Sequence, residues 1–218
     1  MSSLPPLLSS QLSSLVKGPA LLPIIQAETP HEAVLIAKAL QDGGVGSVEV
    51  VLRTRQALAA ITAIRTALPD LLVGAGTILS AADANACKDA GAQFLVSPAS
   101  TPKLLEAMID TGLPFVPGVA TPSEIAMAYE YGLREVKFFP AHLSGGIEML
   151  KALSGVFQQV KFCPTGGIGQ HNLAEFLALK NVFVVGGSWL TPANLVKTQQ
   201  WIQITALAAE ATAIARQI

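Results

Sequence analysis

The chain has 218 residues, of which 51% are hydrophobic and only 13% are charged. This length suits one domain spanning residues 1–218, and an apolar fraction this high favours contact between subunits. Because 14 basic residues balance 15 acidic ones and leave a net charge of −1, we do not expect nucleic acid as a partner. No apolar stretch reaches the roughly 18 residues that a membrane-spanning helix needs, so we expect no membrane partner either.

Residues 1–20 predict a short helix that caps one end of the fold. Four apolar residues recur there at helical spacing: Leu8, Leu12, Leu15 and Val16. Residues 1–18 lack the basic start and the cleavage site of a signal peptide, which favours a cytoplasmic protein. The two cysteines, Cys87 and Cys163, cannot form a disulfide framework, fit a reducing compartment and are expected to pack in the core.

From residue 21 onward, short apolar runs alternate with longer helical patterns, which is typical of repeated βα units. Eight runs rich in Val, Ile and Phe are predicted strands: 22–26, 47–52, 71–75, 94–97, 115–118, 135–139, 161–165 and 183–186. Their ends lie roughly 20 to 26 residues apart, which accommodates one strand, one helix and two short loops. Eight such units predict an α/β fold, a single (β/α)8 TIM barrel. A doubly wound open sheet has the same alternation, but polar residues at the carboxyl ends of several strands favour the barrel.

Helix starts support this order of elements. Four capping threonines each precede a proline at the first helical position: Thr29-Pro30, Thr101-Pro102, Thr121-Pro122 and Thr191-Pro192. Glu32 and Glu124 follow their threonines by three residues, so the sequence predicts capping boxes at Thr29 and Thr121. Residues 199–217 are expected to form the last outer helix and to pack through four apolar side chains: Ile202, Leu207, Ala211 and Ile214.

Lys137 lies in the apolar run 135–139, where a solvated lysine is not expected. Burial disfavours the ammonium form, and the neutral amine is a competent nucleophile toward a ketone. Glu49 is the candidate partner, because two-residue alternation puts Val48 and Val50 on the opposite face of its strand. If the valines face the helices, Glu49 and Lys137 point into the barrel near its mouth. The pair is then either a structural ion pair, which is costly to bury, or an amine with a proton shuttle.

Arg53 follows the second predicted strand with the same side-chain parity as Glu49, and its planar guanidinium suits a substrate carboxylate. A surface arginine in the following loop is the alternative reading. Thr77 follows Gly74-Ala75-Gly76 at the end of the third strand, so its hydroxyl is a candidate second ligand for that carboxylate.

Two glycine-rich segments follow the last two predicted strands: Thr165-Gly166-Gly167-Ile168 and Gly186-Gly187-Ser188. Paired glycines let backbone amides approach an anion, and the loops after strands seven and eight are where many barrels bind phosphate. A single pair can be an ordinary turn. Two pairs at consecutive strand ends favour a phosphate site.

The three histidines, His31, His142 and His171, are scattered and lack the spacing of metal ligands. A metal-dependent aldol mechanism is therefore disfavoured, and no metal site is predicted. Trp189 is expected to pack behind the phosphate loop without a catalytic role.

Taken together, these residues resemble the family of 2-keto-3-deoxy-6-phosphogluconate (KDPG) and 4-hydroxy-2-oxoglutarate (KHG) aldolases. The resemblance covers about residues 22–189. It rests on seven motifs: Glu49-Val50-Val51-Leu52-Arg53-Thr54, Gly74-Ala75-Gly76-Thr77, Ser97-Pro98, Pro117-Gly118, Lys137-Phe138-Phe139-Pro140, Cys163-Pro164-Thr165-Gly166-Gly167-Ile168 and Gly186-Gly187-Ser188-Trp189.

The resemblance implies a class I aldolase in which Lys137 forms an imine with the C2 ketone and Glu49 moves protons, partly through water. Arg53 and Thr77 would hold the substrate carboxylate. The other site residues would shape the pocket (Pro98, Phe139 and Thr165) and bind the phosphate (Gly166, Gly167, Gly187 and Ser188). Cleavage of the C3–C4 bond would give pyruvate and glyceraldehyde 3-phosphate. The resemblance further implies no metal or organic cofactor and a homotrimer.

Two other functions fit parts of the pattern. One is a phosphate-binding barrel isomerase or synthase in which Lys137 never becomes covalent, and the other is a ligand-binding sensor that has kept the pocket. Gln26 departs from several relatives of the family, which have arginine at the end of the first strand. The departure leaves the preference between KDPG and KHG open.

Overall fold

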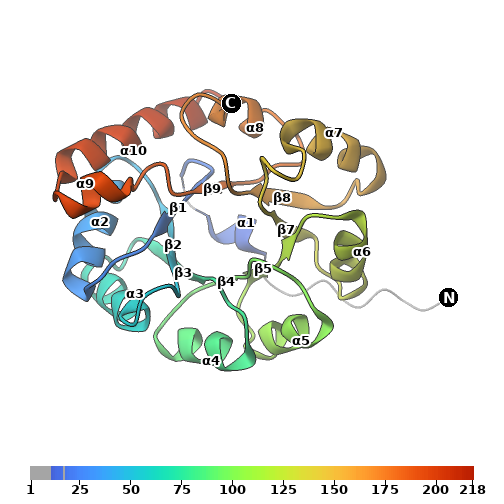
Figure 1. The fold of residues 1–218 in the computed structure, drawn as a ribbon, viewed down its shortest axis with the longest axis horizontal. Helices are drawn as coiled ribbons and strands as arrows, with labels where there is room; N and C mark the ends of the chain where they lie inside the picture. Colours follow the sequence, from blue (N-terminus) through green and yellow to red (C-terminus); the bar gives the residue numbers. More distant parts are fainter. Residues whose placement is uncertain (1–10, 17) are drawn as a thin grey trace.

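The computed structural model describes residues 11–16 and 18–218, and its strands form a ring surrounded by helices (Figure 1). In chain order the elements are α1 (Leu12–Leu15), β1 (Leu21–Ile25), α2 (Pro30–Asp42), β2 (Ser47–Val51), α3 (Ala57–Ala67), β3 (Leu72–Gly76), α4 (Ala81–Asp89), β4 (Leu95–Val96), α5 (Pro102–Asp110), β5 (Phe115–Val116), β6 (Gly118–Val119), α6 (Pro122–Glu130), β7 (Glu135–Phe138), α7 (Gly146–Val156), β8 (Lys161–Pro164), α8 (Leu173–Leu177), β9 (Val185–Gly187), α9 (Ala193–Lys197) and α10 (Trp201–Ala215).

The ring of parallel strands closes. Six strands pair in the order β5-β4-β3-β2-β1-β9, and three more pair in the order β6-β7-β8. Pro117 has no backbone N–H and separates β5 from β6, so these two strands are the halves of one barrel position. Isolated bridges from Phe162 to Val182 and from Thr165 to Gly186 join the segment that contains β8 to the segment that contains β9. The predicted (β/α)8 barrel is therefore confirmed, and the open doubly wound sheet is wrong.

Alternating side chains build two hydrophobic layers, one inside the ring and one beneath the helices. The inner cluster contains Leu12, Leu22, Leu72, Phe94, Val96, Val116, Cys163 and Val184. Val48 and Val50 belong to the outer layer, as their parity predicted, so Glu49 between them faces the interior.

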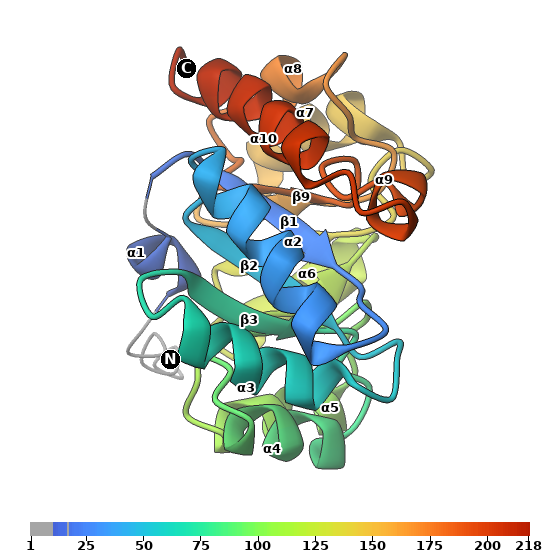
Figure 2. The ribbon, with the colours of Figure 1, turned by 90° about the vertical axis from the view of Figure 1, so that its left-hand side faces the viewer.

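Helix α1 crosses the centre of the ring in Figure 1 and lies at the end of the barrel opposite α9 in Figure 2. Its Leu12 is fully buried in the inner cluster. The backbone N–H of Ser13 donates to the Glu135 carboxylate at 3.1 Å, which fixes the helix to the start of β7. Leu8 lies outside the described residues, so the wider interpretation of residues 1–20 as a cap stays a prediction.

Three of the four predicted threonine caps are present. Thr29, Thr101 and Thr121 each accept a hydrogen bond from the backbone N–H three residues later. The capping box of Thr121 and Glu124 is complete. At Thr29 the box is incomplete, because the Glu32 carboxylate accepts from the Glu28 backbone N–H instead.

Two local predictions about the last helices are wrong. Thr191 does not cap α9, because its hydroxyl donates to the distant carbonyl of Ile24 at 2.7 Å and Pro192 is the residue at the cap position. Ile202 does not pack into the core and is 87% exposed. The buried face of α10 consists of Ile204, Ala208, Ala211 and Thr212, which lie toward the barrel.

Candidate active site

Lys137 and Glu49 meet inside the barrel. Lys137 is the third residue of β7 and Glu49 the third residue of β2, and both point inward from their strands. The Lys137 Nζ lies 3.2 Å from the Glu49 Oε1, with the two side chains only 6% and 0% exposed. The sequence predicts this pair from side-chain parity together with closure of the barrel, and the 3.2 Å contact confirms that the two side chains meet.

Two glycines on the strands beside the pair have no space for a side chain. A Cβ on Gly76 would overlap the Glu49 carboxylate, and a Cβ on Gly118, the strand partner of Lys137, would overlap the backbone of Pro98. These inward positions on β3 and β6 must therefore stay without a side chain. Gly76 thereby leaves room for the Glu49 carboxylate, and Gly118 lets the backbone of Pro98 approach β6.

The Glu49 carboxylate is only half satisfied by protein groups. Its Oε1 accepts from Lys137, whereas its Oε2 is buried and has no hydrogen-bond partner among the residues that the structure describes. A buried unpaired carboxylate oxygen is costly and is typical of a group that acts on a proton. Glu49 can therefore hold the lysine with one oxygen and exchange a proton with a bound molecule through the other.

The neighbours of the lysine are apolar or weakly polar. The Phe139 ring centroid lies 5.4 Å from the Lys137 Nζ. Thr165 is buried, and its hydroxyl lies 3.8 Å from the Cys163 Sγ, which belongs to the inner cluster. Burial raises the pKa of the Cys163 thiol to about 12 despite the opposing charge of Lys137. The thiol therefore stays protonated and adds no charge beside the pair.

Ser97 also belongs to the site, although the sequence pattern marks it only through its Ser-Pro motif. Its hydroxyl accepts from the Gly118 backbone N–H at 3.3 Å and donates to the Ala99 carbonyl at 2.8 Å. These bonds hold the half-buried Pro98 over the strand that neighbours Lys137. A buried serine at the end of a short strand is the signal that would have identified it.

The two predicted carboxylate ligands lie on neighbouring strand ends. Thr77 directly follows β3 and has a φ of 65°, a left-handed backbone that is strained for a β-branched residue. Arg53 follows β2, is exposed and lines a cavity of about 600 Å³. The ion pair of Lys137 and Glu49 does not include Arg53.

The two glycine segments lie side by side at the mouth. Thr165 and Gly186 form a bridge, which brings the two segments together. Gly166 and Gly167 have φ values of 100° and 74°, and a Cβ on Gly167 would overlap His142. A side chain at either position would be strained, which accounts for the glycines. On the second segment the Trp189 ring packs against Gly187, as predicted, and Ser188 is exposed.

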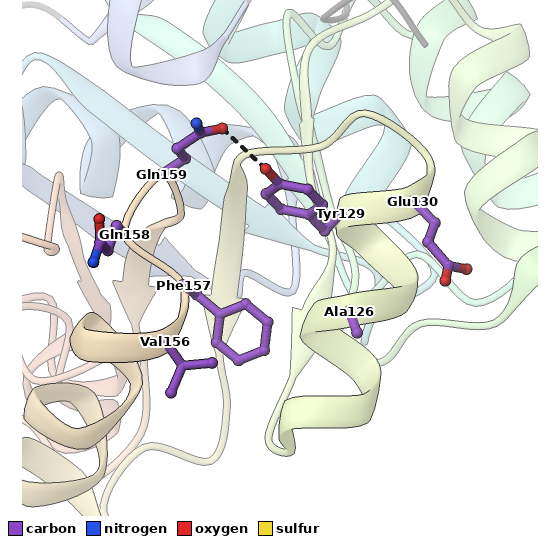
Figure 3. Close-up of a pocket in the computed structure, with 7 residues that line it drawn as sticks. All are labelled: Ala126, Tyr129, Glu130, Val156, Phe157, Gln158 and Gln159. Carbon is purple, nitrogen blue, oxygen red and sulfur yellow. Dashed lines mark hydrogen bonds between the residues drawn. The ribbon is translucent and has the colours of Figure 1, made fainter. Parts of the chain in front are cut away.

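A second cavity, of about 440 Å³, lies at the other end of the barrel between α6 and α7 (Figure 3). The Tyr129 hydroxyl donates to the Gln159 Oε1 at 3.0 Å along its wall. Its lining contains no lysine or arginine: Ala126, Tyr129, Glu130, Val156, Phe157, Gln158 and Gln159. The lining residues lie toward the amino ends of the strands, so the cavity is separate from Lys137.

No group of three or more His, Cys, Asp or Glu side chains within residues 11–16 and 18–218 is placed to hold a metal ion. In the same part of the chain, every helix is too short or too polar to cross a membrane.

A buried lysine paired with a carboxylate inside a closed barrel, beside two adjoining glycine loops, is typical of the class of barrel enzymes that use a lysine amine. Comparison with known proteins gives the family. Residues 12–207 match the family described as KDPG and KHG aldolase, and the chain belongs to it.

Two relatives and two solved structures illustrate the similarity. The chain is 46% identical to the KHG/KDPG aldolase of Escherichia coli K12, covering 93% of this chain and 95% of that protein. It is 46% identical to the 2-dehydro-3-deoxy-phosphogluconate aldolase of Dickeya dadantii, covering 91% and 93%. The Legionella pneumophila KDPG aldolase, solved with pyruvate captured as a covalent carbinolamine, superposes with a TM-score of 0.89 at 42% identity, covering 93% and 98%. The Zymomonas mobilis KDPG aldolase with 3-phosphoglycerate has a TM-score of 0.86 at 38% identity, covering 93% and 95%. The protein is thus an aldolase, a carbon–carbon lyase.

Proposed function

We propose that this aldolase cleaves KDPG to pyruvate and glyceraldehyde 3-phosphate through a Schiff base on Lys137, and that it also cleaves KHG to pyruvate and glyoxylate. The observation that carries the proposal is the buried contact of 3.2 Å between the Lys137 Nζ and the Glu49 Oε1. It places a nucleophile and a proton acceptor within hydrogen-bond reach in a site that excludes bulk water.

The first half of the reaction forms the imine. Lys137 gives a proton to Glu49, and the neutral amine attacks the C2 carbonyl to form a carbinolamine. Glu49 then protonates the departing hydroxyl, so that water leaves and the protonated imine forms. The free Oε2 supports this role, because the carboxylate can keep its contact with the lysine while the other oxygen serves the substrate.

The second half breaks the C3–C4 bond. Glu49, acting directly or through a water molecule, removes the proton of the C4 hydroxyl. The bonding electrons then move toward the protonated imine, which acts as the electron sink, and the aldehyde leaves. The resulting enamine takes a proton at C3, and hydrolysis of the imine releases pyruvate and restores the Lys137 amine.

The remaining residues bind and orient the substrate. We assign the substrate carboxylate to Arg53 and Thr77, whose types and positions at adjoining strand ends support the assignment. We assign the pocket walls to three residues around the amine: Pro98, Phe139 and Thr165. We assign the phosphate to the adjoining loops after β8 and β9, through Gly166, Gly167, Gly187 and Ser188, because left-handed glycines expose backbone N–H groups.

The assembly proposed for the protein is a homotrimer. Its support is the family resemblance together with large apolar side chains on the surface, among them Leu143 at 82% and Val156 at 75% exposed. We also propose that the protein acts in the cytoplasm, where Cys87 and Cys163, both free and buried, would remain reduced. Light scattering after size-exclusion chromatography tests the assembly, and a mass of one chain would contradict the trimer.

Release of pyruvate from each substrate tests the reaction. Pyruvate is measured with lactate dehydrogenase while KDPG and KHG are varied separately. We expect turnover of both, with a higher kcat/KM for KDPG because its phosphate adds contacts to the glycine loops. If neither KDPG nor KHG yields pyruvate, the proposal is refuted.

A further inference from the structure

The assigned phosphate ligands carry no charge. Gly166, Gly167 and Gly187 offer only backbone N–H groups, and Ser188 offers a hydroxyl. A phosphate monoester carries about −1.5 to −2 charges at neutral pH. Dipoles alone can hold such an anion, but charge-assisted bonds are roughly twice as strong as neutral ones. A basic side chain near the two loops would therefore strengthen phosphate binding.

One cavity connects the second loop to such a side chain. The cavity of about 600 Å³ beside the mouth is lined by Ser188 and Lys197, with Arg53 also in its wall. Ser188 closes the glycine loop, and Lys197 is the last residue of α9, the short helix that follows this loop. Figure 2 places α9 at the end of the barrel opposite α1, which is the end where the carboxyl ends of the strands meet.

The charge of Lys197 is not used elsewhere in the described part of the chain. The ion pairs found there join Lys38 to Asp42, Lys137 to Glu49 and Lys151 to Glu148. The carboxylates that line the same cavity belong to Glu28 and Glu32 at the start of α2. Glu32 accepts the Glu28 backbone N–H at 2.7 Å, so it is engaged with its own helix start, and neither glutamate is among the residues of the three ion pairs.

We infer that Lys197 is the cationic ligand of the substrate phosphate, reaching from α9 across this cavity to the group held by Ser188 and the glycine loops. The inference rests on the proposed aldolase function and adds a determinant of substrate choice to it. Arg53, which lines the same cavity, serves the carboxylate of both substrates, whereas Lys197 serves only the substrate that carries a phosphate.

Kinetics with Lys197→Ala test the inference. We expect the KM for KDPG to rise about 10-fold with kcat unchanged, because one exposed charge-assisted contact is lost. The KM for KHG, which has no phosphate, should change less than about twofold. Lys197→Arg keeps the charge and should restore most of the affinity for KDPG. Lys88→Ala, which removes an exposed lysine from α4, is the matched control and should leave both substrates unaffected.

Inorganic phosphate gives a second, direct probe. It should inhibit KDPG cleavage competitively, and its inhibition constant should rise in Lys197→Ala but not in Lys88→Ala. An unchanged KM for KDPG, or an equal rise for both substrates, would overturn the role of Lys197. The aldolase proposal is judged separately by pyruvate release in the unmodified chain, so the two failures are distinguishable.

Discussion

Lys137 and Glu49 form an ion pair that is buried inside a hydrophobic barrel. Removing two charges from water costs several kcal/mol per ion, and their attraction seldom returns much more than this. Pairs of this kind contribute little to stability, which supports the proposed catalytic role of Lys137 and Glu49. The free Glu49 Oε2 strengthens this conclusion, because a purely structural carboxylate would have both oxygens bonded.

Glu49→Gln tests the proton shuttle. The amide keeps the shape of the side chain and a hydrogen-bond acceptor for Lys137, but it cannot take up a proton. We expect kcat for KDPG to fall by about 100-fold or more, with a smaller change in KM. Steady-state pyruvate release measures this. A kcat within about threefold of the unmodified enzyme would show that Glu49 is not the shuttle.

Gly76→Ala tests whether the position of the carboxylate matters. Its Cβ would overlap the Glu49 carboxylate, so Glu49 must move away from Lys137. We expect a loss of kcat of about 100-fold, close to that of Glu49→Gln. The control is Gly155→Ala on α7, where a Cβ would meet nothing within 4 Å. This control should keep full activity and gain about 0.5–1 kcal/mol in the free energy of unfolding. Equal activity of Gly76→Ala and Gly155→Ala would contradict the expected displacement of Glu49.

At the scale of single elements, α1 depends on a buried carboxylate. Glu135 is only 5% exposed at the start of β7 and accepts the Ser13 N–H. Burial raises the pKa of this carboxyl, although the hydrogen bonds from α1 oppose the shift. A raised pKa in the folded state means that folding binds a proton. The stabilisation is therefore complete below the unfolded-state pKa and is lost as the pH rises through the higher folded-state value.

Glu135→Gln removes this titration while keeping an acceptor for Ser13. We expect its free energy of unfolding, relative to that of the unmodified chain, to increase as the pH is raised from about 4 to 7, since only the unmodified chain must then bury a carboxylate. Urea unfolding across this range measures the difference. A difference that stays constant or falls with pH would contradict the burial argument.

Local signals in the sequence predicted helix caps well where the two residues that form the cap are close along the chain. The capping box of Thr121 and Glu124 needs only three residues and was correct. The cap at Thr191 was wrong because Ile24, 167 residues away, takes its hydroxyl. The exposure of Ile202 could not be predicted either, because the packing of α10 against α2 determines which face of the helix is buried.

At the scale of the whole molecule, closure of the ring followed from eight evenly spaced units, and closure is what brings β2 and β7 across one interior. Parity and closure together predicted the Lys137–Glu49 pair. The cavity that Ser188, Arg53 and Lys197 share could not be predicted, since it depends on the path of α9 over the mouth. The roles of Gly76 and Gly118 were also hidden, because only the folded ring shows what a side chain would meet there.

The two cysteines report on the integrity of the whole barrel. Burial raises the pKa of each thiol to about 12, with Asp83 adding to the effect at Cys87. We expect neither thiol to react with a disulfide reagent at pH 8 while the protein is folded, and both to react in denaturant. Thiol titration with and without guanidinium measures this. Rapid reaction of either cysteine in the folded protein would contradict the packing described for it.

Borohydride reduction in the presence of pyruvate tests the covalent role of Lys137 most directly. Reduction should add the mass of one carboxyethyl group per chain, and peptide mapping should place it on Lys137. The Lys137→Ala variant should remain folded by circular dichroism, unlabelled and inactive. An unlabelled protein that still releases pyruvate from KDPG, or an adduct on another lysine, would contradict a Schiff base at Lys137.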